Sequence, residues 1–200
     1  MLAMVITAPE PLRSQLRGLS RTQLVAACMR LRPDLSELAD PPATKIALRS
    51  VATRARALDR EARALNTQLY ELTTTFAPAT SAIFGLGSDT TASLLVAIGD
   101  NPDWLRSEAA FAHLRGVAPI PASSGKTHRH RLHRGGDRAG NRALHIAVVV
   151  RLRYDPRSRA YANRRRSDGL TTPEIIRCQK RYLAREVFRA LRADYTQLTT

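Results

Sequence analysis

Hydrophobic residues recur at alternating spacings of three and four residues along one stretch of the chain. The residues of this seam are Leu48, Val51, Ala55, Leu58, Ala62, Leu65, Leu69, Leu72 and Phe76. The spacing is that of the a and d positions of a coiled coil, and charged residues such as Arg54, Asp59 and Arg60 lie off the seam. We expect residues 44–77 to form one coiled-coil helix that pairs protomers or joins two domains. The alternative is a long helix packed on its own domain.

On either side of this helix, the hydrophobic periodicity extends over shorter stretches of the chain. Residues 1–43 allow only short helices, broken near Gly18 and Pro33. Residues 78–195 carry several amphipathic helical patterns and are expected to form a compact helical domain. The pair Thr172-Pro173 starts its last helix. The residues of that helix expected to face the core are Ile175, Ile176, Tyr182, Leu183 and Val187. The predicted fold class is mostly α, a long coiled-coil helix followed by a compact helical domain.

A pair of glycines marks the start of another predicted helix. Gly85 and Gly87 flank Leu86 and precede an apolar helical pattern over residues 89–98, with Gly99 as its C-cap. Such a turn is similar to the helix-hairpin-helix, in which exposed backbone amides hold a DNA phosphate. Gly85 and Gly87 are therefore candidate nucleic-acid contacts. An ordinary turn at a helix start explains the same pattern.

The segment from Gly116 to Asn141 places a candidate nucleophile beside a dense run of positive charge. The tripeptide Ser123-Ser124-Gly125 opens the run, and no carboxylate interrupts it before Asp137. The candidate phosphate contacts are Lys126, Arg129, Arg131, Arg134, Arg138, Asn141 and Arg142. A serine that attacks a phosphodiester needs an activated hydroxyl and neutralised charge on the phosphorus, and arginines meet the second need. A Ser-Ser-Gly turn by itself is more often structural.

The charge of the chain is concentrated toward one end. The formal net charge is +15, and residues 123–192 hold 19 Lys and Arg against 5 Asp and Glu. This asymmetry predicts a polyanionic partner, with nucleic acid as the first candidate. An anionic membrane surface is the rival partner. It is disfavoured because no segment approaches ~20 uninterrupted apolar residues.

Cysteine and histidine usage predicts no metal site. Cys28 and Cys178 stand alone, without a CxxC pair or a neighbouring histidine at ligand spacing. His128, His130 and His133 have a spacing that could hold a metal, but the surrounding positive charge opposes cation binding. The opening MLAMVITAP lacks the features of a signal peptide, so we expect a cytoplasmic protein.

Two stretches of the chain resemble the carboxyl-terminal transposase domain of a bacterial insertion-sequence family. They are APIPASSGKTHRHRLHRGGDRAGNRALHIAVVVRLRYDPRSRAYANRRRSDG and EIIRCQKRYLAREVFR. Members of this family join an amino-terminal RuvC-like domain, which bears a DEDD carboxylate set, to a carboxyl-terminal domain with a catalytic serine. A structured bridge RNA guides them. The resemblance runs from about Val5 to about Phe188 and covers the coiled coil and the transposase domain.

The resemblance implies roles for residues of this chain. It assigns the nucleophile to Ser124, because the family's serine directly precedes the glycine of its SG motif. It implies that Mg²⁺ is held by carboxylates upstream of the part represented here, so no cofactor is expected in this chain. Residues 1–43 would then be the remnant that joins the absent domain to the rest. The isolated chain is expected to bind nucleic acid without cleaving it efficiently.

These inferences together predict a part of an insertion-sequence transposase, an enzyme of DNA transposition and recombination. Its expected partners are DNA, a structured guide RNA and a second copy of the chain through the coiled coil. The alternative is a non-catalytic nucleic-acid-binding remnant or accessory protein.

Overall fold

The computed structural model describes residues 1–34, 42–99, 106–122 and 129–198. The chain divides into two compact units, Met1–Leu65 and Asn66–Thr200. The boundary between the units falls inside one long helix, α4 (Pro42–Phe76). The reason is that the first turns of α4 contribute to the core of the first unit.

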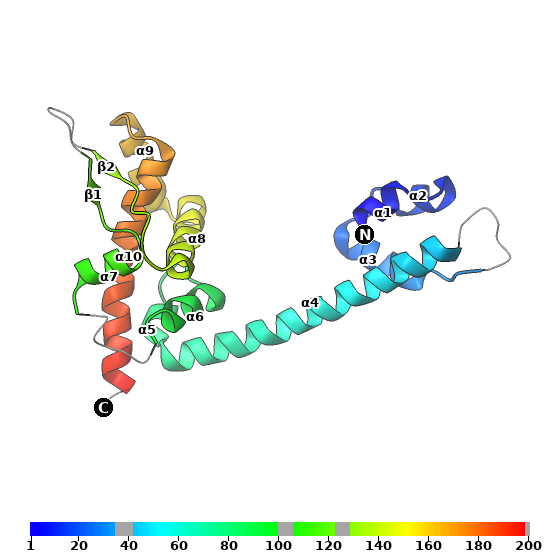
Figure 1. The fold of residues 1–200 in the computed structure, drawn as a ribbon, viewed down its shortest axis with the longest axis horizontal. Coiled ribbons are helices and arrows are strands. Elements are labelled where there is room, and N and C mark those ends of the chain that lie inside the picture. The colour runs from blue at the N-terminus through cyan, green and yellow to red at the C-terminus, as the bar shows by residue number, and fades with distance from the viewer. Residues whose placement is uncertain (35–41, 100–105, 123–128, 199–200) are drawn as a thin grey trace. The chain divides into compact units, whose positions relative to one another are not determined.

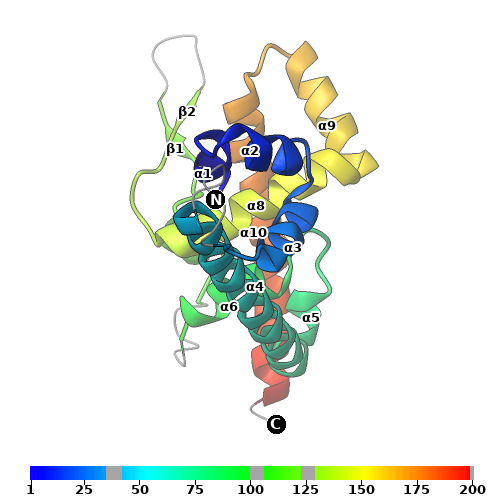
Figure 2. The same cartoon turned by 90° about the vertical axis from the view of Figure 1, so that its right-hand side faces the viewer.

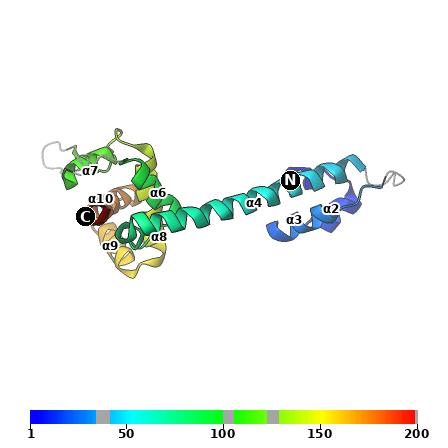
Figure 3. The same ribbon diagram turned by 90° about the horizontal axis from the view of Figure 1, so that it is seen from below.

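The first unit contains three short helices and the beginning of α4. They are α1 (Leu2–Ile6), α2 (Glu10–Leu16) and α3 (Arg21–Arg30). Ser20 caps α3, because its hydroxyl accepts from the Gln23 amide while the Gln23 side chain accepts from the Ser20 amide. Leu12, Leu24 and Leu48 are fully buried in a shared core, and α3 lies alongside the first turns of α4 (Figure 3).

The long helix predicted from the heptad pattern is confirmed, since α4 runs without interruption for 35 residues. Leu48 at its start is buried, but the later apolar positions of the seam are not. Leu58, Leu65 and Leu72 are exposed to 46%, 53% and 54%. A stripe of leucines on a helix that is otherwise polar is therefore uncovered within the described residues of a single chain.

The second unit packs its other helices around the last one, α10 (Thr172–Leu198) (Figure 1 and Figure 2). The helices that contact α10 are α5 (Pro78–Ser81), α7 (Glu108–Leu114), α8 (Arg138–Tyr154) and α9 (Pro156–Ser167). A further helix, α6 (Ser88–Val96), packs on α8. Leu94, Phe111, Leu144, Leu183 and Val187 are buried in the common core. The compact helical region confirms the predicted mostly-α fold class.

The described part of the chain contains one small sheet, a hairpin between α7 and α8. Strand β1 (Ile120–Pro121) pairs antiparallel with β2 (His130–Arg131), with Ile120 opposite Arg131 and Pro121 opposite His130. The amide of Ala122 also donates to the carbonyl of Arg129, at 2.8 Å. The sequence predicted a loop here. The strands went unnoticed because each is only two residues long.

The sequence analysis did not identify helix α9, which is formed by a basic stretch of the chain. The helix has no apolar stripe, and Ala162 is its only buried residue. Its start is nevertheless well defined, because Asp155 accepts hydrogen bonds from the amides of Arg157 and Ser158. Pro156 occupies the first helical position, where proline is favoured.

The prediction was wrong for one residue of α10 that was expected to lie in the core. Ile175, Leu183 and Val187 are buried as the pattern predicted, but Tyr182 is 50% exposed. Its ring lies edge to face with that of Tyr161 of α9, at a centroid distance of 5.7 Å. None of the described helices carries an apolar stretch of the length that crossing a membrane requires.

Candidate functional site

The basic segment predicted from the sequence is carried by the β1–β2 hairpin and the start of α8. Residues 123–128 lie outside the described residues, and with them Ser124 and Lys126. The flanking basic residues are described. The arginines of the predicted set with exposed side chains are Arg129, Arg131, Arg134, Arg138 and Arg142. Arg129 has a carboxylate near it, with 3.7 Å between its terminal nitrogen and Glu174.

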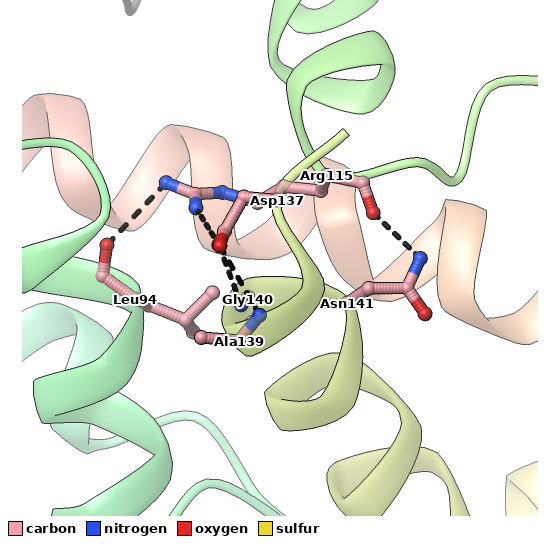
Figure 4. A network of polar contacts seen from close by, with 6 residues as sticks. All are labelled: Leu94, Arg115, Asp137, Ala139, Gly140 and Asn141. Carbon is pink, nitrogen blue, oxygen red and sulfur yellow. Dashed lines mark hydrogen bonds and ion pairs between the residues drawn. The ribbon is translucent and has the colours of Figure 1, made fainter. Parts of the chain in front are cut away.

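The two ends of this basic segment are joined by a buried ion pair (Figure 4). Arg115, directly after α7, has a fully buried side chain and lies 2.8 Å from Asp137, directly before α8. Arg115 also donates to the Leu94 carbonyl at 3.4 Å and lies over the Phe111 ring at 5.1 Å. Burial lowers the pKa of Arg115, and the charge and hydrogen bond of Asp137 oppose that shift. Asp137 therefore offsets part of the cost of burying the guanidinium.

Asp137 has a second task, because it caps α8. Its carboxylate accepts from the amides of Ala139 and Gly140 at 3.1 and 2.6 Å, and its own amide donates to the Leu114 carbonyl at 2.7 Å. Gly140 has to be a glycine in this arrangement. A Cβ atom there would lie 2.6 Å from the Arg115 guanidinium. The end of α7 and the start of α8 are thus held in one geometry.

Asn141 tightens the same junction from the other side. Its amide nitrogen donates to the carbonyls of Arg115 and Gly116, at 2.7 and 3.1 Å, and its amide oxygen accepts from Lys180 of α10. Lys180 is buried, and desolvation lowers its pKa. Asn141 was predicted to contact nucleic acid. In the structure it bridges the Arg115 turn, α8 and α10, with both ends of its side-chain amide used inside the fold. A nucleic-acid contact by Asn141 stays a prediction.

The two glycines of the turn before α6 have roles inside the fold. Gly85 has a φ of +94°, and a Cβ atom there would lie 2.8 Å from the Ala147 carbonyl of α8. The amide of Gly87 donates to the Thr90 hydroxyl at 2.8 Å. The ordinary helix-start turn accounts for both residues. A phosphate contact by Gly85 or Gly87 stays a prediction.

Two arginines of α10 also form ion pairs inside the fold. Arg181 and Arg185 both lie close to Glu108 at the start of α7, at 3.0 and 2.6 Å. Desolvation alone would raise the pKa of Glu108, but hydrogen bonds from Arg181 and Arg185 outweigh it and hold the pKa below its usual value. This cluster fastens α7, and with it the turn at Arg115, onto α10.

The Glu108 cluster predicts an acid-sensitive contribution to stability. A carboxylate whose pKa is lower in the folded state stabilises the fold above its unfolded pKa, and this contribution is lost as pH falls through the folded value. We expect Glu108→Gln to reduce the fall in the free energy of unfolding between neutral pH and pH below about 4.5. Glu174 and Asp155 also have lowered pKa values, so some of the fall should remain. Denaturant titrations over this pH range measure the effect.

The matched control is Glu61→Gln, which removes an exposed carboxylate of α4. It should leave the pH dependence of the second unit as in the wild type. Equal pH dependence in Glu108→Gln and the wild type would contradict the assignment of Glu108 as an anchor of α7.

The sequence analysis did not identify the residues that hold the end of α7 and the start of α8 together, which are Arg115, Asp137 and Lys180. Asp137 before a helical pattern is an ordinary N-cap signal and could have been identified. Arg115 and Lys180 carry no such signal, because arginine and lysine are rarely buried and their burial depends on partners distant in sequence. Among the described residues, no three His, Cys, Asp or Glu side chains are grouped in a way that could hold a metal ion.

Part of this unit is similar to a known protein family. Residues 77–163 match the model of a transposase family, and this range runs from the start of α5 through the hairpin and α8 into α9. The family is described as the transposase IS116/IS110/IS902 family, so this stretch of the chain is similar to a transposase domain.

Two relatives are insertion-element proteins. The chain is 32% identical over 134 residues to the insertion element IS110 uncharacterized 43.6 kDa protein of Streptomyces coelicolor, which covers 66% of this chain and 33% of that protein. It is 34% identical over 86 residues to the insertion element IS900 uncharacterized 42 kDa protein of Mycobacterium paratuberculosis, which covers 42% of this chain and 22% of that protein. The chain thus matches a third or less of the length of each relative.

Proposed function

We propose that this chain acts in DNA transposition as the part of an insertion-sequence transposase that grips DNA and supplies a serine nucleophile. The observation that carries the proposal is the set of exposed arginines on the hairpin and the start of α8, next to the ion pair of buried Arg115 with Asp137. This set lies inside the segment that matches the transposase family. Arginine suits the task because its planar fork can bind a phosphate with two hydrogen bonds.

The contacts that hold the basic segment in place matter for the chemistry. Catalysis of phosphoryl transfer depends mainly on positioning and on charges placed in advance. Arg115, Asp137 and Asn141 hold the two ends of the basic segment, so Arg129, Arg131 and Arg138 would meet a phosphate with little reorganisation. The same surface is proposed to contact a structured guide RNA, because phosphate contacts carry no sequence information of their own.

The proposed reaction uses the hydroxyl of Ser124. Its oxygen forms a bond to the phosphorus of a DNA phosphodiester while one phosphorus–oxygen bond of the strand breaks. The serine gives up its proton, and the departing strand end leaves as a free hydroxyl. The product is a phosphoserine that joins the chain covalently to DNA, and a second hydroxyl can reverse the step to join strands. Neighbouring arginines would balance the negative charge that develops on the phosphate.

The resemblance of the sequence to a family that uses Mg²⁺ also bears on this proposal. The described residues do not fit a Mg²⁺ site, since no cluster of carboxylates lies among them. We therefore assign the metal-binding carboxylates to the RuvC-like domain of the intact enzyme. On this account the chain binds DNA by itself and cleaves it efficiently only when that domain is supplied.

Replacing Ser124 with Ala tests the reaction. With the RuvC-like domain supplied, strand joining should fall by several orders of magnitude, because removal of a nucleophile abolishes the covalent step. DNA affinity should be unchanged, since the hydroxyl carries no charge. The assay is strand exchange on a labelled DNA, followed by a search for DNA bound covalently to the protein.

The adjacent serine offers a matched control, because Ser123→Ala removes the same atom one residue away. This variant should exchange strands as the wild type does. If Ser124→Ala retains strand exchange, the chain is better described as a non-catalytic nucleic-acid-binding protein.

The exposed stripe on α4 supports a further part of the proposal, that two copies of the chain pair through this helix. The uncovered positions keep heptad spacing, and two such stripes would cover each other. Leu65→Glu should therefore halve the mass measured by light scattering at micromolar concentration. Ala64→Glu is the control, because it adds the same charge at an exposed position of the same helix that faces away from the seam. A wild-type chain that is monomeric under these conditions would contradict the pairing.

A further inference from the structure

A cavity of about 510 Å³ lies between Phe84 and the helices α8, α9 and α10. It is distinct from the basic hairpin and plays no part in the function proposed above. Three of its lining residues are aromatic, namely Phe84, Tyr161 and Tyr182. Aromatic residues make up only 5% of the chain, so their grouping around one cavity sets this site apart. The volume is in the range of pockets that hold small organic molecules.

The charged groups of the cavity largely cancel one another. Arg151 donates to both carboxylate oxygens of Glu186, at 3.1 and 2.6 Å, and to the Phe84 carbonyl at 2.7 Å. Asp155 is occupied by the start of α9, where it accepts from the Ser158 amide and hydroxyl. Two arginines and two carboxylates line the site in total. A phosphate would need an excess of positive charge, so the interior suits an uncharged group.

The aromatic side chains favour a planar occupant. Tyr182 and Phe84 are 50% and 55% exposed, so both rings are accessible from solvent. Burial is the main cause that raises the pKa of Tyr161 to about 12, with Cys178 and Tyr182 contributing, and this wall is therefore neutral at physiological pH. Guanidinium groups accompany two of the rings, with Arg164 over Tyr161 at 5.6 Å and Arg185 over Tyr182 at 5.9 Å. Aromatic rings and arginine planes are the groups on which proteins stack unpaired bases.

The surface of α9 around the cavity is strongly basic. The arginines of this helix are Arg157, Arg159, Arg164, Arg165 and Arg166, and the helix has no acidic residue. Arg165 pairs with Asp168 at 3.0 Å, whereas the side chain of Arg157 at the cavity has no ion pair with a described residue. The neutral aromatic cavity is complementary to the base of a nucleotide, and the basic surface around it is complementary to the phosphates. The base would enter the cavity while the phosphates on either side meet the arginines.

We propose that this cavity receives one unpaired nucleobase of a bound nucleic acid, stacked against Tyr182, with arginines of α9 on the adjoining phosphates. The inference rests on the proposed function in requiring that the chain bind nucleic acid. It adds a site that distinguishes an unpaired base from a fully paired duplex. The base can belong to DNA or to RNA, because the cavity reads a feature common to both.

The test compares two labelled probes, a duplex with one bulged adenine and the same duplex without the bulge, each made as DNA and as RNA. Tyr182→Ala should weaken binding of the bulged probe by roughly 10-fold, the loss typical for removal of one stacking ring. Binding of the fully paired duplex should not change. Tyr182→Phe keeps the ring and should retain the preference for the bulge. The DNA and RNA arms show which nucleic acid supplies the base.

Tyr154→Ala is the matched control, since Tyr154 is another exposed tyrosine with an arginine over its ring and does not line the cavity. It should bind both probes as the wild type does. Equal behaviour of Tyr182→Ala and Tyr154→Ala, or an equal loss on both probes, would overturn the base-binding site and leave the proposed function intact. A wild-type chain that binds neither probe would contradict both.

Discussion

Asp137→Asn is expected to lower the free energy of unfolding of the second unit by about 3–5 kcal/mol, the usual cost of leaving one member of a buried ion pair without its partner. The substitution keeps a side chain that can cap α8, because asparagine is as good an N-cap as aspartate. What it removes is the negative charge 2.8 Å from a guanidinium that is fully buried. A fall in melting temperature of roughly 10 °C or more should accompany the change.

The control for this prediction is Asp168→Asn. Asp168 also pairs with an arginine, Arg165, at 3.0 Å, but the side chains of this pair are 34% (Arg165) and 47% (Asp168) exposed to solvent. Its loss should cost at most about 1 kcal/mol. Circular dichroism of the two variants during chemical denaturation gives the comparison directly. Equal destabilisation by both substitutions would show that burial of Arg115 does not set the strength of its ion pair with Asp137.

Neutralising the exposed arginines of the hairpin and the start of α8 is expected to weaken DNA binding at moderate salt by roughly 100-fold or more. The reason is that each lost phosphate contact reduces the number of counterions released on binding, and this release drives binding. The variant changes Arg129, Arg131, Arg134, Arg138 and Arg142 to glutamine. These side chains are exposed, so the fold should keep its stability. Fluorescence anisotropy with a labelled duplex measures the affinity.

A second variant tests whether DNA affinity depends on where the positive charge lies or only on the net charge of the chain. It changes five exposed arginines of α4 to glutamine, namely Arg49, Arg54, Arg56, Arg60 and Arg63. Both variants lower the formal net charge from +15 by five. If the hairpin is the binding surface, the α4 variant should bind DNA nearly as well as the wild type. An equal loss in the two variants would mean that overall charge, and no particular surface, attracts DNA.

The sequence predicted the helices whose apolar residues recur regularly. The seam from Leu48 to Phe76 identified α4, and the pair Thr172-Pro173 marked the start of α10. Helix α9 was missed because a helix that buries one alanine has no periodic signal, and Tyr182 was placed in the core because periodicity does not distinguish the core from the rim of a cavity.

For the candidate site, the sequence predicted the positive charge but not the contacts that hold the site in place. Exposed arginines between prolines and glycines are visible in the sequence, whereas the ion pair of Arg115 with Asp137 joins residues 22 positions apart. Asn141 shows the same limit. A polar residue within a basic run is read as a ligand contact, and only the three-dimensional structure shows that its amide is bound by Lys180 and by the carbonyls of Arg115 and Gly116.

The salt dependence of DNA binding tests the central claim most directly, that the hairpin arginines contact the phosphates. The slope of log affinity against log salt concentration should become less steep by up to ~4.5 in the hairpin variant, because each lost contact with duplex DNA reduces it by about 0.9. The slope of the α4 variant should stay close to that of the wild type. A hairpin variant with the wild-type slope would contradict the account, since its arginines would then make no contact with the DNA.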